Sequence, residues 1–308
     1  MTAIADNFAL PFEIERNGLR GRLVRLGDSV DGILQRHRYP AVVSALLGEA
    51  LALAACLAST VKIEEGVFTL QAKGGGGPVR LLVADVTSEG ALRGYVGFDA
   101  EAVAALPAEE VSTARLFGGG HLAFTVDQGA DFERYQGIVE LAGESLADAV
   151  HQYFRQSEQI GSGLKLACTQ GEDGRWRAGA LLVQKLPDDV IRKAAPEDIP
   201  DLVEADEGFR RALILMGSAT AAEMTDATLP AEHLLFRLFH EDGVRVYDRR
   251  EVVDRCRCRI DRIESVLRQF GRARVEEFKV DGAVKVTCEF CTRERVFDDA
   301  ALDAMGLE

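Results

Sequence analysis

Cysteine is scarce in this sequence: six occur among 308 residues, and four of the six fall into two close pairs. Tryptophan occurs once and histidine five times, and the five histidines have no spacing typical of metal ligands. The glycine-rich stretches KGGGGPVR and FGGGH lack the lysine and serine or threonine that end a phosphate-binding loop. With no catalytic constellation and no ATP motif, we expect a protein that is not an enzyme and whose chemistry lies in its cysteines.

An excess of positive charge is also lacking. The formal net charge of −14 argues against nucleic acid as the partner of the whole chain, because phosphate binding needs a positive field. The charge is uneven: residues 188–226 hold ten acidic and four basic residues (net −6), and residues 249–274 hold nine basic and four acidic residues (net +5). Neighbouring segments of opposite charge are expected to attract or regulate each other.

The N-terminal stretch MTAIADNFALPFEIE has neither the basic start nor the continuous apolar run of a signal peptide. We therefore expect a cytoplasmic chain with reduced cysteines and no membrane partner. One apolar stretch, residues 41–61, has the length of a membrane span, but it contains Glu49 and many alanines, so we interpret it as a buried core helix. Cys56 and Cys168 are interpreted as small core hydrophobes.

Residues 1–187 are predicted to form an α+β domain, with helices packed on a mostly antiparallel sheet. Short β-type runs bounded by glycine recur from Phe68 to Leu186, after helix-like stretches at 29–37 and 40–61. In ESLADAVHQYFRQSEQ, Ser145 followed three residues later by Asp148 resembles the capping box that begins a helix.

Residues 188–248 have no strand pattern and are interpreted as a helical linker. In LPAEHLLFRLFHEDG an apolar face is formed by Leu234, Leu235, Leu238 and Phe239. We hypothesise that the linker helices cover apolar surface of the N-terminal domain. The side chains expected to do so are Phe209, Leu213, Leu215, Phe236 and Phe239.

Residues 249–308 are predicted to be a small C-terminal module. Ile260, Ile263, Leu267 and Phe270 recur at helical spacing before Gly271, and Asp281-Gly282 is a two-residue hairpin turn. A module of about 60 residues has a marginal core, so an additional cross-link is expected to hold it together.

Four cysteines supply the expected cross-link. Cys256 and Cys258 are two apart, so in an extended segment both sulfurs lie on one side. Cys288 and Cys291 have the C-x-x-C spacing of a sulfur knuckle, and 29 residues separate the two pairs. This pattern predicts a site for one zinc ion with four thiolate ligands. Resting disulfides, unligated core cysteines and an iron–sulfur cluster are the alternatives.

This site is also a predicted redox switch. Arginines at 255, 257 and 259 would favour the thiolates, the form that oxidants attack, although a solvated basic face is an equally good interpretation of them. Oxidation of either cysteine pair removes two zinc ligands. Since structural zinc contributes on the order of 10 kcal/mol to modules this small, losing it would unfold the module and free the linker.

The sequence resembles the 33 kDa chaperonin family of redox-regulated heat-shock holdases almost from end to end. The resemblance is carried by HLLFRLFHEDGVRVYD, CRC and VTCEFCTRERVFD, and by LLGEALALAACLA, GGGHLAFTVD, RYQGIVELAGESLADAVHQYFRQSEQI and GALLVQKLP. It implies a chaperone that is idle while the four cysteines bind zinc. Oxidation then forms disulfides Cys256–Cys258 and Cys288–Cys291, zinc leaves, and the protein, usually a homodimer, holds unfolding client proteins without ATP.

Two positions depart from the family pattern: Arg259, commonly a small serine, and Arg295, where an aromatic residue is expected. They leave the ligands intact, and we hypothesise that the extra arginines speed thiolate oxidation. One rival interpretation is a nucleic-acid-binding zinc ribbon, favoured by the +5 stretch but disfavoured by the total charge. Another is a thiol–disulfide oxidoreductase, which would normally place its C-x-x-C near a βαβ pattern.

Overall fold

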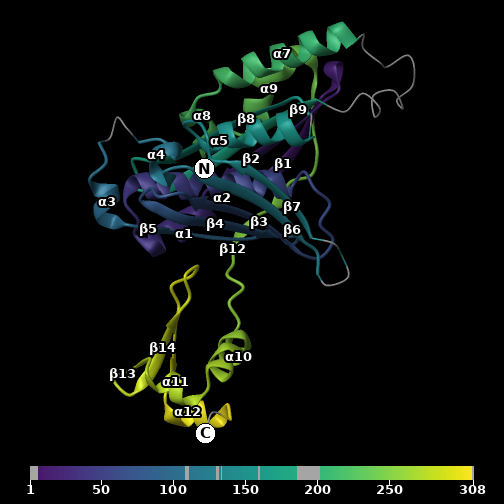
Figure 1. The fold of residues 1–308 in the computed structure, drawn as a ribbon. Helices are drawn as coiled ribbons and strands as arrows, with labels where there is room; N and C mark the ends of the chain where they lie inside the picture. Colours follow the sequence, from purple (N-terminus) through teal and green to yellow (C-terminus); the bar gives the residue numbers. More distant parts are fainter. Residues whose placement is uncertain are drawn as a thin grey trace. The chain divides into compact units, whose positions relative to one another are not determined.

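The computed structural model describes residues 6–107, 111–129, 132, 134–158, 160–185 and 202–306. Tertiary contacts divide the chain into two compact units, Met1–Asp254 and Arg255–Glu308, and each is described by itself. Helices mixed with largely antiparallel sheets confirm the predicted α+β class. Figure 1 shows the elements of each unit.

The first sheet of the larger unit is antiparallel throughout. Its strands are β1 (Asn7–Ile14), β2 (Leu19–Leu26), β8 (Ser162–Gln170), β9 (Trp176–Lys185), β10 (Val244–Val246) and β11 (Arg250–Glu251). Their order is β10-β1-β2-β9-β8, with β11 also beside β1. The sequence analysis did not predict β1 and β2, which flank the short 3-10 helix η1 (Glu15–Asn17). Apolar residues alternate along β1 (Phe8, Leu10, Phe12 and Ile14) and could have predicted this strand, whereas β2 contains three arginines and is buried on both faces toward its end.

The second sheet has the order β12-β5-β4-β3-β6-β7. Its strands are β3 (Val67–Gly74), β4 (Val79–Thr87), β5 (Ala91–Phe98), β6 (Gly120–Asp127), β7 (Tyr135–Glu140) and β12 (Val253–Asp254). Only the β12–β5 pair is parallel. The glycine-bounded runs predicted from residue 68 onward are therefore strands, but they divide between two sheets.

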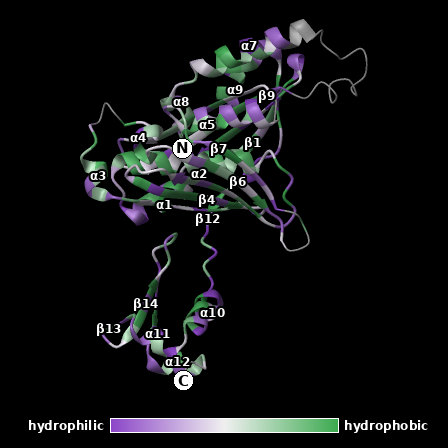
Figure 2. Ribbon diagram, viewed as in Figure 1, coloured by the Kyte–Doolittle hydropathy of each residue, from purple (hydrophilic) through white to green (hydrophobic). Residues whose placement is uncertain are grey.

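Helix α2 (Ala41–Ala58) lies between the two sheets and contacts β2, β8 and β9 of one and β3, β4 and β5 of the other. It is long and apolar enough to cross a membrane, yet most of its side chains are buried between the sheets, which confirms the prediction of a core helix. Figure 2 shows the hydrophobic colouring of α2.

The other helices before the linker are α1 (Asp28–His37), α3 (Ala100–Ala104), α4 (Thr113–Phe117), α5 (Leu146–Tyr153) and the π-helical turn η3 (Phe154–Glu158). Of these, α1 packs on α2, and α4 and α5 pack on strands. The capping box predicted at the start of α5 is confirmed: Ser145 Oγ accepts from the Asp148 backbone N–H, and the Asp148 carboxylate accepts from the Ser145 backbone N–H.

Helices of the predicted linker cover the outer face of the first sheet. They are α7 (Leu202–Ser218), α8 (Ala221–Thr225), α9 (Ala231–Phe239) and the 3-10 turn η5 (His240–Asp242). The apolar face predicted for α9 is confirmed, since its four residues are buried against the sheet, where Phe239 stacks on Phe12 with ring centroids 5.8 Å apart. Residues 186–201, which include the start of the predicted linker, lie outside the described residues.

Four of the five linker side chains expected to cover apolar surface do so. Phe239 is buried, and Phe209, Leu213 and Leu215 are half-buried against the same cluster. The expectation was wrong for Phe236, which is 62% exposed. The face of α9 that meets the sheet is centred on Leu235 and Phe239, so Phe236 is turned outward, where its ring contacts His240.

The smaller unit packs two helices and a C-terminal helix around a three-stranded sheet. Its elements are α10 (Ile260–Phe270), α11 (Arg272–Glu276), β13 (Lys279–Val280), β14 (Ala283–Thr287), β15 (Glu294–Phe297) and α12 (Asp299–Ala304). The hairpin turn is confirmed: Val280 pairs with Ala283, and Asp281 and Gly282 both have positive φ, as a type I′ turn requires.

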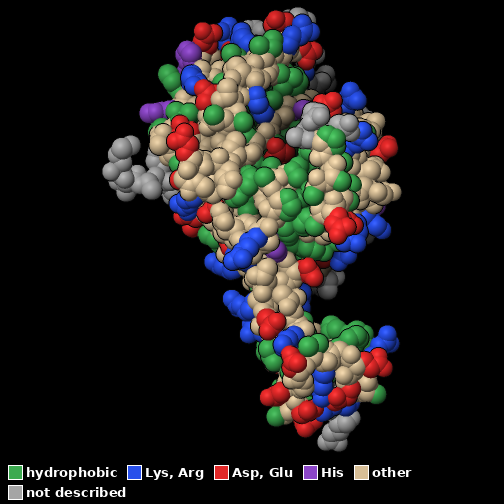
Figure 3. Space-filling model, turned by 90° about the vertical axis from the view of Figure 1, so that its left-hand side faces the viewer, with side chains coloured by type: hydrophobic (Ala, Val, Ile, Leu, Met, Phe, Trp, Pro, Cys, Tyr) green, Lys and Arg blue, Asp and Glu red, His purple; other side chains and the backbone are tan. Residues whose placement is uncertain are grey.

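The core of the smaller unit is small. Its buried hydrophobic cluster consists of Leu267, Val275, Val284, Phe297 and Leu302. Large apolar side chains remain exposed in the same unit, and Figure 3 shows hydrophobic side chains among the charged ones on its surface. They are Ile260, Val266, Phe270, Phe278, Val280 and Val296. A core with so few buried residues is consistent with a module whose stability depends on a cross-link.

Candidate metal centre

Two irregular segments of the smaller unit bring the four cysteines together. Cys256 and Cys258 lie in an extended stretch between β12 and α10, and Arg259, in the β conformation, begins the helix. Cys288 and Cys291 lie in the turn between β14 and β15. The strand pairing of β14 with β15 fixes the ends of this turn, so both of its sulfurs are presented from a rigid hairpin.

The four sulfur atoms form one cluster, with all Sγ atoms within 4.8 Å of one another. Cys256 Sγ lies 3.8 Å from Cys288 Sγ, and Cys258 Sγ lies 3.6 Å from Cys291 Sγ. A tetrahedral site with metal–sulfur bonds of about 2.3 Å has sulfurs about 3.8 Å apart. The cluster therefore has the size that a four-thiolate metal site requires. Among the residues that the structure describes, it is the one group of this kind.

The C-x-x-C turn is closed by its own backbone. Thr292 N–H donates to the Cys288 carbonyl at 2.8 Å, and Cys288 N–H donates to the Arg293 carbonyl at 3.0 Å. To make this turn Thr292 adopts φ +55°, the left-handed region that a β-branched residue rarely occupies. The turn therefore stores backbone strain beside the sulfurs.

Without a bound cation, the surroundings of the four cysteines do not keep all four thiols deprotonated. Burial raises the pKa of the Cys291 thiol to about 12 and also raises the pKa of Cys258. Burial acts in the same direction on Cys256, but hydrogen bonds from the Cys258 backbone N–H and from neighbouring thiols outweigh it and lower the pKa of Cys256. Since metal ligands must be deprotonated, a bound cation would supply the missing stabilisation. The donor set therefore fits a metal ion.

The two departures from the family pattern lie close to the cluster. Arg259 is 70% exposed, and its Nε donates to Asp261 Oδ1 at 3.0 Å, at the start of α10. Arg295 is half-buried on β15 opposite Val286. Their effect on thiolate oxidation stays a prediction.

The other two cysteines lie in the larger unit. Among the described residues, neither of them belongs to a group of possible metal ligands. Cys56 is fully buried in α2, and Cys168 packs from β8 against Gly48 of α2. Burial raises the pKa of Cys56 to about 12 and raises that of Cys168 above the usual range. Both are therefore inert thiols, as expected of core hydrophobes.

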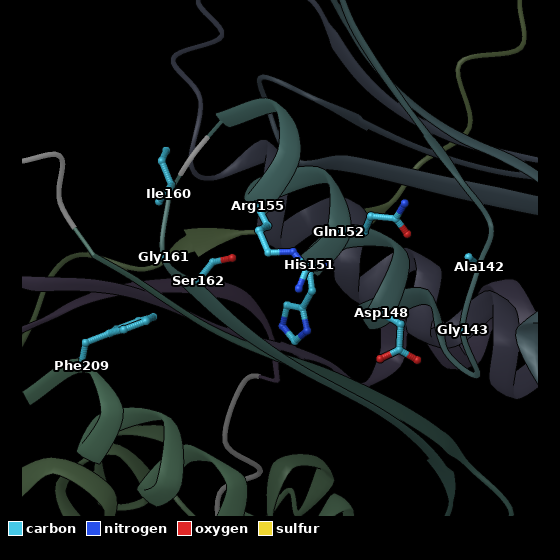
Figure 4. A pocket seen from close by; sticks show the side chains of 10 residues that line it. All are labelled: Ala142, Gly143, Asp148, His151, Gln152, Arg155, Ile160, Gly161, Ser162 and Phe209. Carbon is cyan, nitrogen blue, oxygen red and sulfur yellow. The ribbon is translucent and has the colours of Figure 1, made fainter. Parts of the chain in front are cut away.

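The larger unit also has a pocket of about 680 Å³, where α5 and η3 meet β8 and α7 (Figure 4). Asp148, His151 and Arg155 line it together with Phe209 of the linker helix α7. His151 Nε2 accepts a hydrogen bond from Leu164 N–H at 2.8 Å, and Asp148 caps its own helix. Asp148 and His151 are therefore engaged in capping α5 and in joining it to β8.

A sequence profile described as Hsp33 protein matches residues 7–298. The chain belongs to the Hsp33 family. The 33 kDa chaperonin of Caulobacter vibrioides is 41% identical over 298 residues, 95% of each chain. That of Pseudomonas fluorescens strain SBW25 is 35% identical over 303 residues, 97% of this chain and 94% of its own. The resemblance stated from the sequence motifs is thereby confirmed.

The structural comparison agrees with the sequence profile. The crystal structure of the 33 kDa chaperonin of Thermotoga maritima, an Hsp33 homologue, is similar with a TM-score of 0.78 and covers 97% of both chains. At 23% identity this likeness shows the Hsp33 fold and no more.

Two features of this Hsp33 chain were not predicted. Arg25 of β2 is only 2% exposed and donates hydrogen bonds to the carbonyls of Glu223, Asp226 and Leu229 around the end of α8. Its one sequence signal is an arginine within the apolar run RLVRLG. The second feature is the short segment that precedes Cys256, residues 250–254, whose two-residue strands are too short for a periodic pattern.

Proposed function

We propose that this protein is a redox-regulated, ATP-independent holdase, inactive when reduced and zinc-bound and active when oxidised. Membership of a chaperone family supports the holdase activity. The observation that carries the regulation is the convergence of four sulfurs, all within 4.8 Å, in a unit whose core has five buried hydrophobic residues. A module with so small a core depends on its metal for its fold.

Zinc is the metal we propose, one ion per chain. Four thiolates in tetrahedral contact are the usual ligands of structural zinc. The N–H group of Cys258, which donates to Cys256 Sγ, orients that sulfur and lowers its basicity. When bound, the ion would hold all four cysteines as thiolates and tie the segment before α10 to the β14–β15 turn.

Oxidation by a peroxide removes these ligands. Two hydrogen peroxide molecules accept four electrons from four thiolates; two S–S bonds form, and four protons from solvent complete four water molecules. We propose the pairs Cys256–Cys258 and Cys288–Cys291. In the folded cluster Cys256 Sγ also lies 3.8 Å from Cys288 Sγ, and Cys258 Sγ lies 3.6 Å from Cys291 Sγ, so peptide mapping of the oxidised protein distinguishes the two pairings.

Release of the module would then expose the surface that binds clients. The proposed regions are an N-terminal domain at 1–187, a linker at 188–248 and a redox module at 249–308. The linker helices α7 and α9 cover apolar side chains of the first sheet, which include Phe8, Leu10 and Phe12. Undocking α7 and α9 would expose the apolar faces of these helices and the apolar face of the first sheet. Exposed apolar surface of this kind can bind unfolding chains. The active form is proposed to be a homodimer in the cytoplasm.

The packing of the arginines weighs against the nucleic-acid alternative. Arg272 pairs with Glu276, Asp299 and Asp303, and Arg259 pairs with Asp261. Arg259, Arg272 and Arg268, which pairs with Glu264, are therefore matched by carboxylates inside the module. Salt-dependent binding of RNA by the reduced protein would favour the alternative.

The test is aggregation of a heat-unfolding client, followed by light scattering without nucleotide. We expect the peroxide-oxidised, zinc-released protein to suppress scattering and the zinc-bound reduced protein to have little effect. A Cys168→Ser variant serves as the matched control, because Cys168 lies outside the cluster. Suppression that is equal in both redox states would refute the regulation, and no suppression in either would refute the chaperone.

A further inference from the structure

Residues 250–254, which we call the strap, occupy an edge of both large sheets. Within the strap, β11 pairs with β1, with Glu251 opposite Phe8. The next strand, β12, pairs with β5, with Val253 opposite Ala91. One five-residue segment therefore fills two sheet edges, and it ends two residues before Cys256.

The strap is held mainly through its backbone. Val252 N–H donates to the Asn7 carbonyl at 3.0 Å, and Val253 N–H donates to the Gly90 carbonyl at 2.9 Å. The Val252 carbonyl accepts from Ser29 Oγ at 3.0 Å. Backbone hydrogen bonds do not depend on the side chains of the added strand, so these edges can accept extended segments of many sequences.

One strap side chain is fully inserted. Val252 is 3% exposed and belongs to the main core cluster of the larger unit, whereas Arg250 and Glu251 on one side of it are exposed. The edge therefore selects for one apolar residue in the middle of an extended segment and tolerates polar neighbours.

A hollow of about 460 Å³ lies beside the strap, which contributes Arg250, Glu251 and Val252 to its wall. The rest of its lining is mixed: one part is apolar, formed by Ala9, Ala55, Ala58, Val61, Ile63 and Val86, and another is polar, formed by Ser59, Thr87, Ser88 and Glu89. The apolar part of the hollow gives space for side chains larger than those of the strap, and the polar part can accept the polar neighbours of such a residue.

Gly90 makes room for a strand at this edge. Its φ is +79°, and a Cβ built on it would lie 2.1 Å from the Glu251 carbonyl oxygen. A side chain at this position would therefore push any strand away from the start of β5.

We propose that the edges of β1 and β5 now held by the strap form a binding site for an extended, apolar segment of an unfolding client, which takes the place of the strap. This inference rests on the proposed function and names the site of client contact. The strap is retained in the reduced protein by contacts that a client lacks, among them the Arg36–Asp254 ion pair and Arg249 over the Phe8 ring at 4.2 Å. A client is therefore admitted only after the strap has left.

The probe is a fluorescent peptide of residues 247–255, YDRREVVDR. We expect it to bind the oxidised full-length protein at least tenfold more tightly than the reduced protein, whose own strap competes. N-methylation at Val252 and Val253 should weaken binding at least tenfold, because it removes the two N–H donors. A permanently unfolded protein, such as reduced and carboxymethylated α-lactalbumin, should displace the peptide.

Matched variants test the site on the protein side. Gly90→Ala should weaken peptide binding to the oxidised protein at least tenfold. Gly97→Ala, within β5, should not, because its added Cβ would lie 3.9 Å from the nearest atom. If Gly90→Ala fails to fold, the N-methylated peptide still tests whether binding depends on backbone pairing at these edges.

The outcomes separate this inference from the proposed function. If the oxidised protein suppresses aggregation but the peptide neither binds nor is displaced by the unfolded protein, the inference is wrong and the function stands. If the peptide converts an oxidised dimer to monomers without affecting client binding, the edges hold the strap of a second copy, which also overturns it. If no form suppresses aggregation, both fail.

Discussion

Arg25 Nη1 donates a hydrogen bond to the carbonyl oxygen of Asp226 at 2.9 Å, across 201 positions of sequence. A second nitrogen of the same guanidinium donates to the Glu223 carbonyl at 3.0 Å. A fully buried arginine in the first sheet thus satisfies the carbonyls at the end of α8, which would otherwise be unpaired. This contact connects the first sheet to α8, which lies in the region that the proposed switch must release.

Arg25→Met should loosen the linker in the reduced, zinc-bound protein. The substitution leaves buried carbonyls without donors, which costs about 2 kcal/mol or more. Backbone amides of α8 and α9 should exchange hydrogen faster, and some client suppression should appear without oxidant. Arg20→Met is the control, since Arg20 is exposed on the same strand. Equal exchange in the two variants would show that Arg25 does not hold the linker.

Thr292→Gly should stabilise the metal centre. Glycine adopts φ +55° without steric cost, so relieving the strain at this position should strengthen metal retention by about 1 kcal/mol. The measurement is competition for zinc against a chromophoric chelator. Thr287→Gly at the end of β14 should have the opposite effect, because glycine weakens a strand. Weaker zinc binding by Thr292→Gly would contradict the role assigned to strain.

Disulfide mapping should find Cys256 joined to Cys258 and Cys288 joined to Cys291 after peroxide treatment. Peptide mass spectrometry of the unreduced protein measures this directly. Cys56 and Cys168 should remain reduced, because burial raises both thiol pKa values. Bonds between Cys256 and Cys288 and between Cys258 and Cys291 would instead mean that oxidation traps the folded cluster, and the proposed unfolding of the module would be wrong.

Glu49→Gln should stabilise the larger unit more at pH 8 than at pH 5.5. Burial raises the pKa of Glu49 from 4.5 to about 7. Between these values the unfolded chain loses its proton first, so wild-type stability falls as pH rises through this range and stays lower above it. Glutamine removes a cost of up to about 3 kcal/mol at pH 8.

Chemical denaturation of zinc-bound protein at the two pH values tests this expectation. Glu101→Gln provides the control, since Glu101 is exposed on α3 and its replacement should have nearly the same effect at both. A Glu49→Gln effect that does not change with pH would show that the carboxyl ionises in the same way in the folded and unfolded chain.

The cluster of four cysteines could be predicted from sequence, because the spacing within each cysteine pair is typical of metal ligands. The hairpin turn at Asp281-Gly282, the capping box at Ser145 and the helix ending at Gly271 are equally local, and the structure confirms all three. Each depends on a few neighbouring residues, so no tertiary information is needed.

Features that depend on distant partners were not accessible in this way. The second half of β2 is buried on both faces by the surrounding layers, and the exposure of Phe236 depends on how α9 rotates against the sheet. The positions of Arg25 and of the strap follow from contacts more than 150 residues away in sequence. A local sequence pattern does not show which distant residues will become contact partners.

The most direct test of the redox switch follows zinc release and client protection in one sample. Peroxide is added to zinc-bound reduced protein with a chromophoric chelator, and aliquots are mixed at intervals with a heat-unfolding client. The account predicts that suppression of light scattering rises with the same time course as zinc release. Suppression that appears while zinc is retained, or complete zinc loss without suppression, would contradict it.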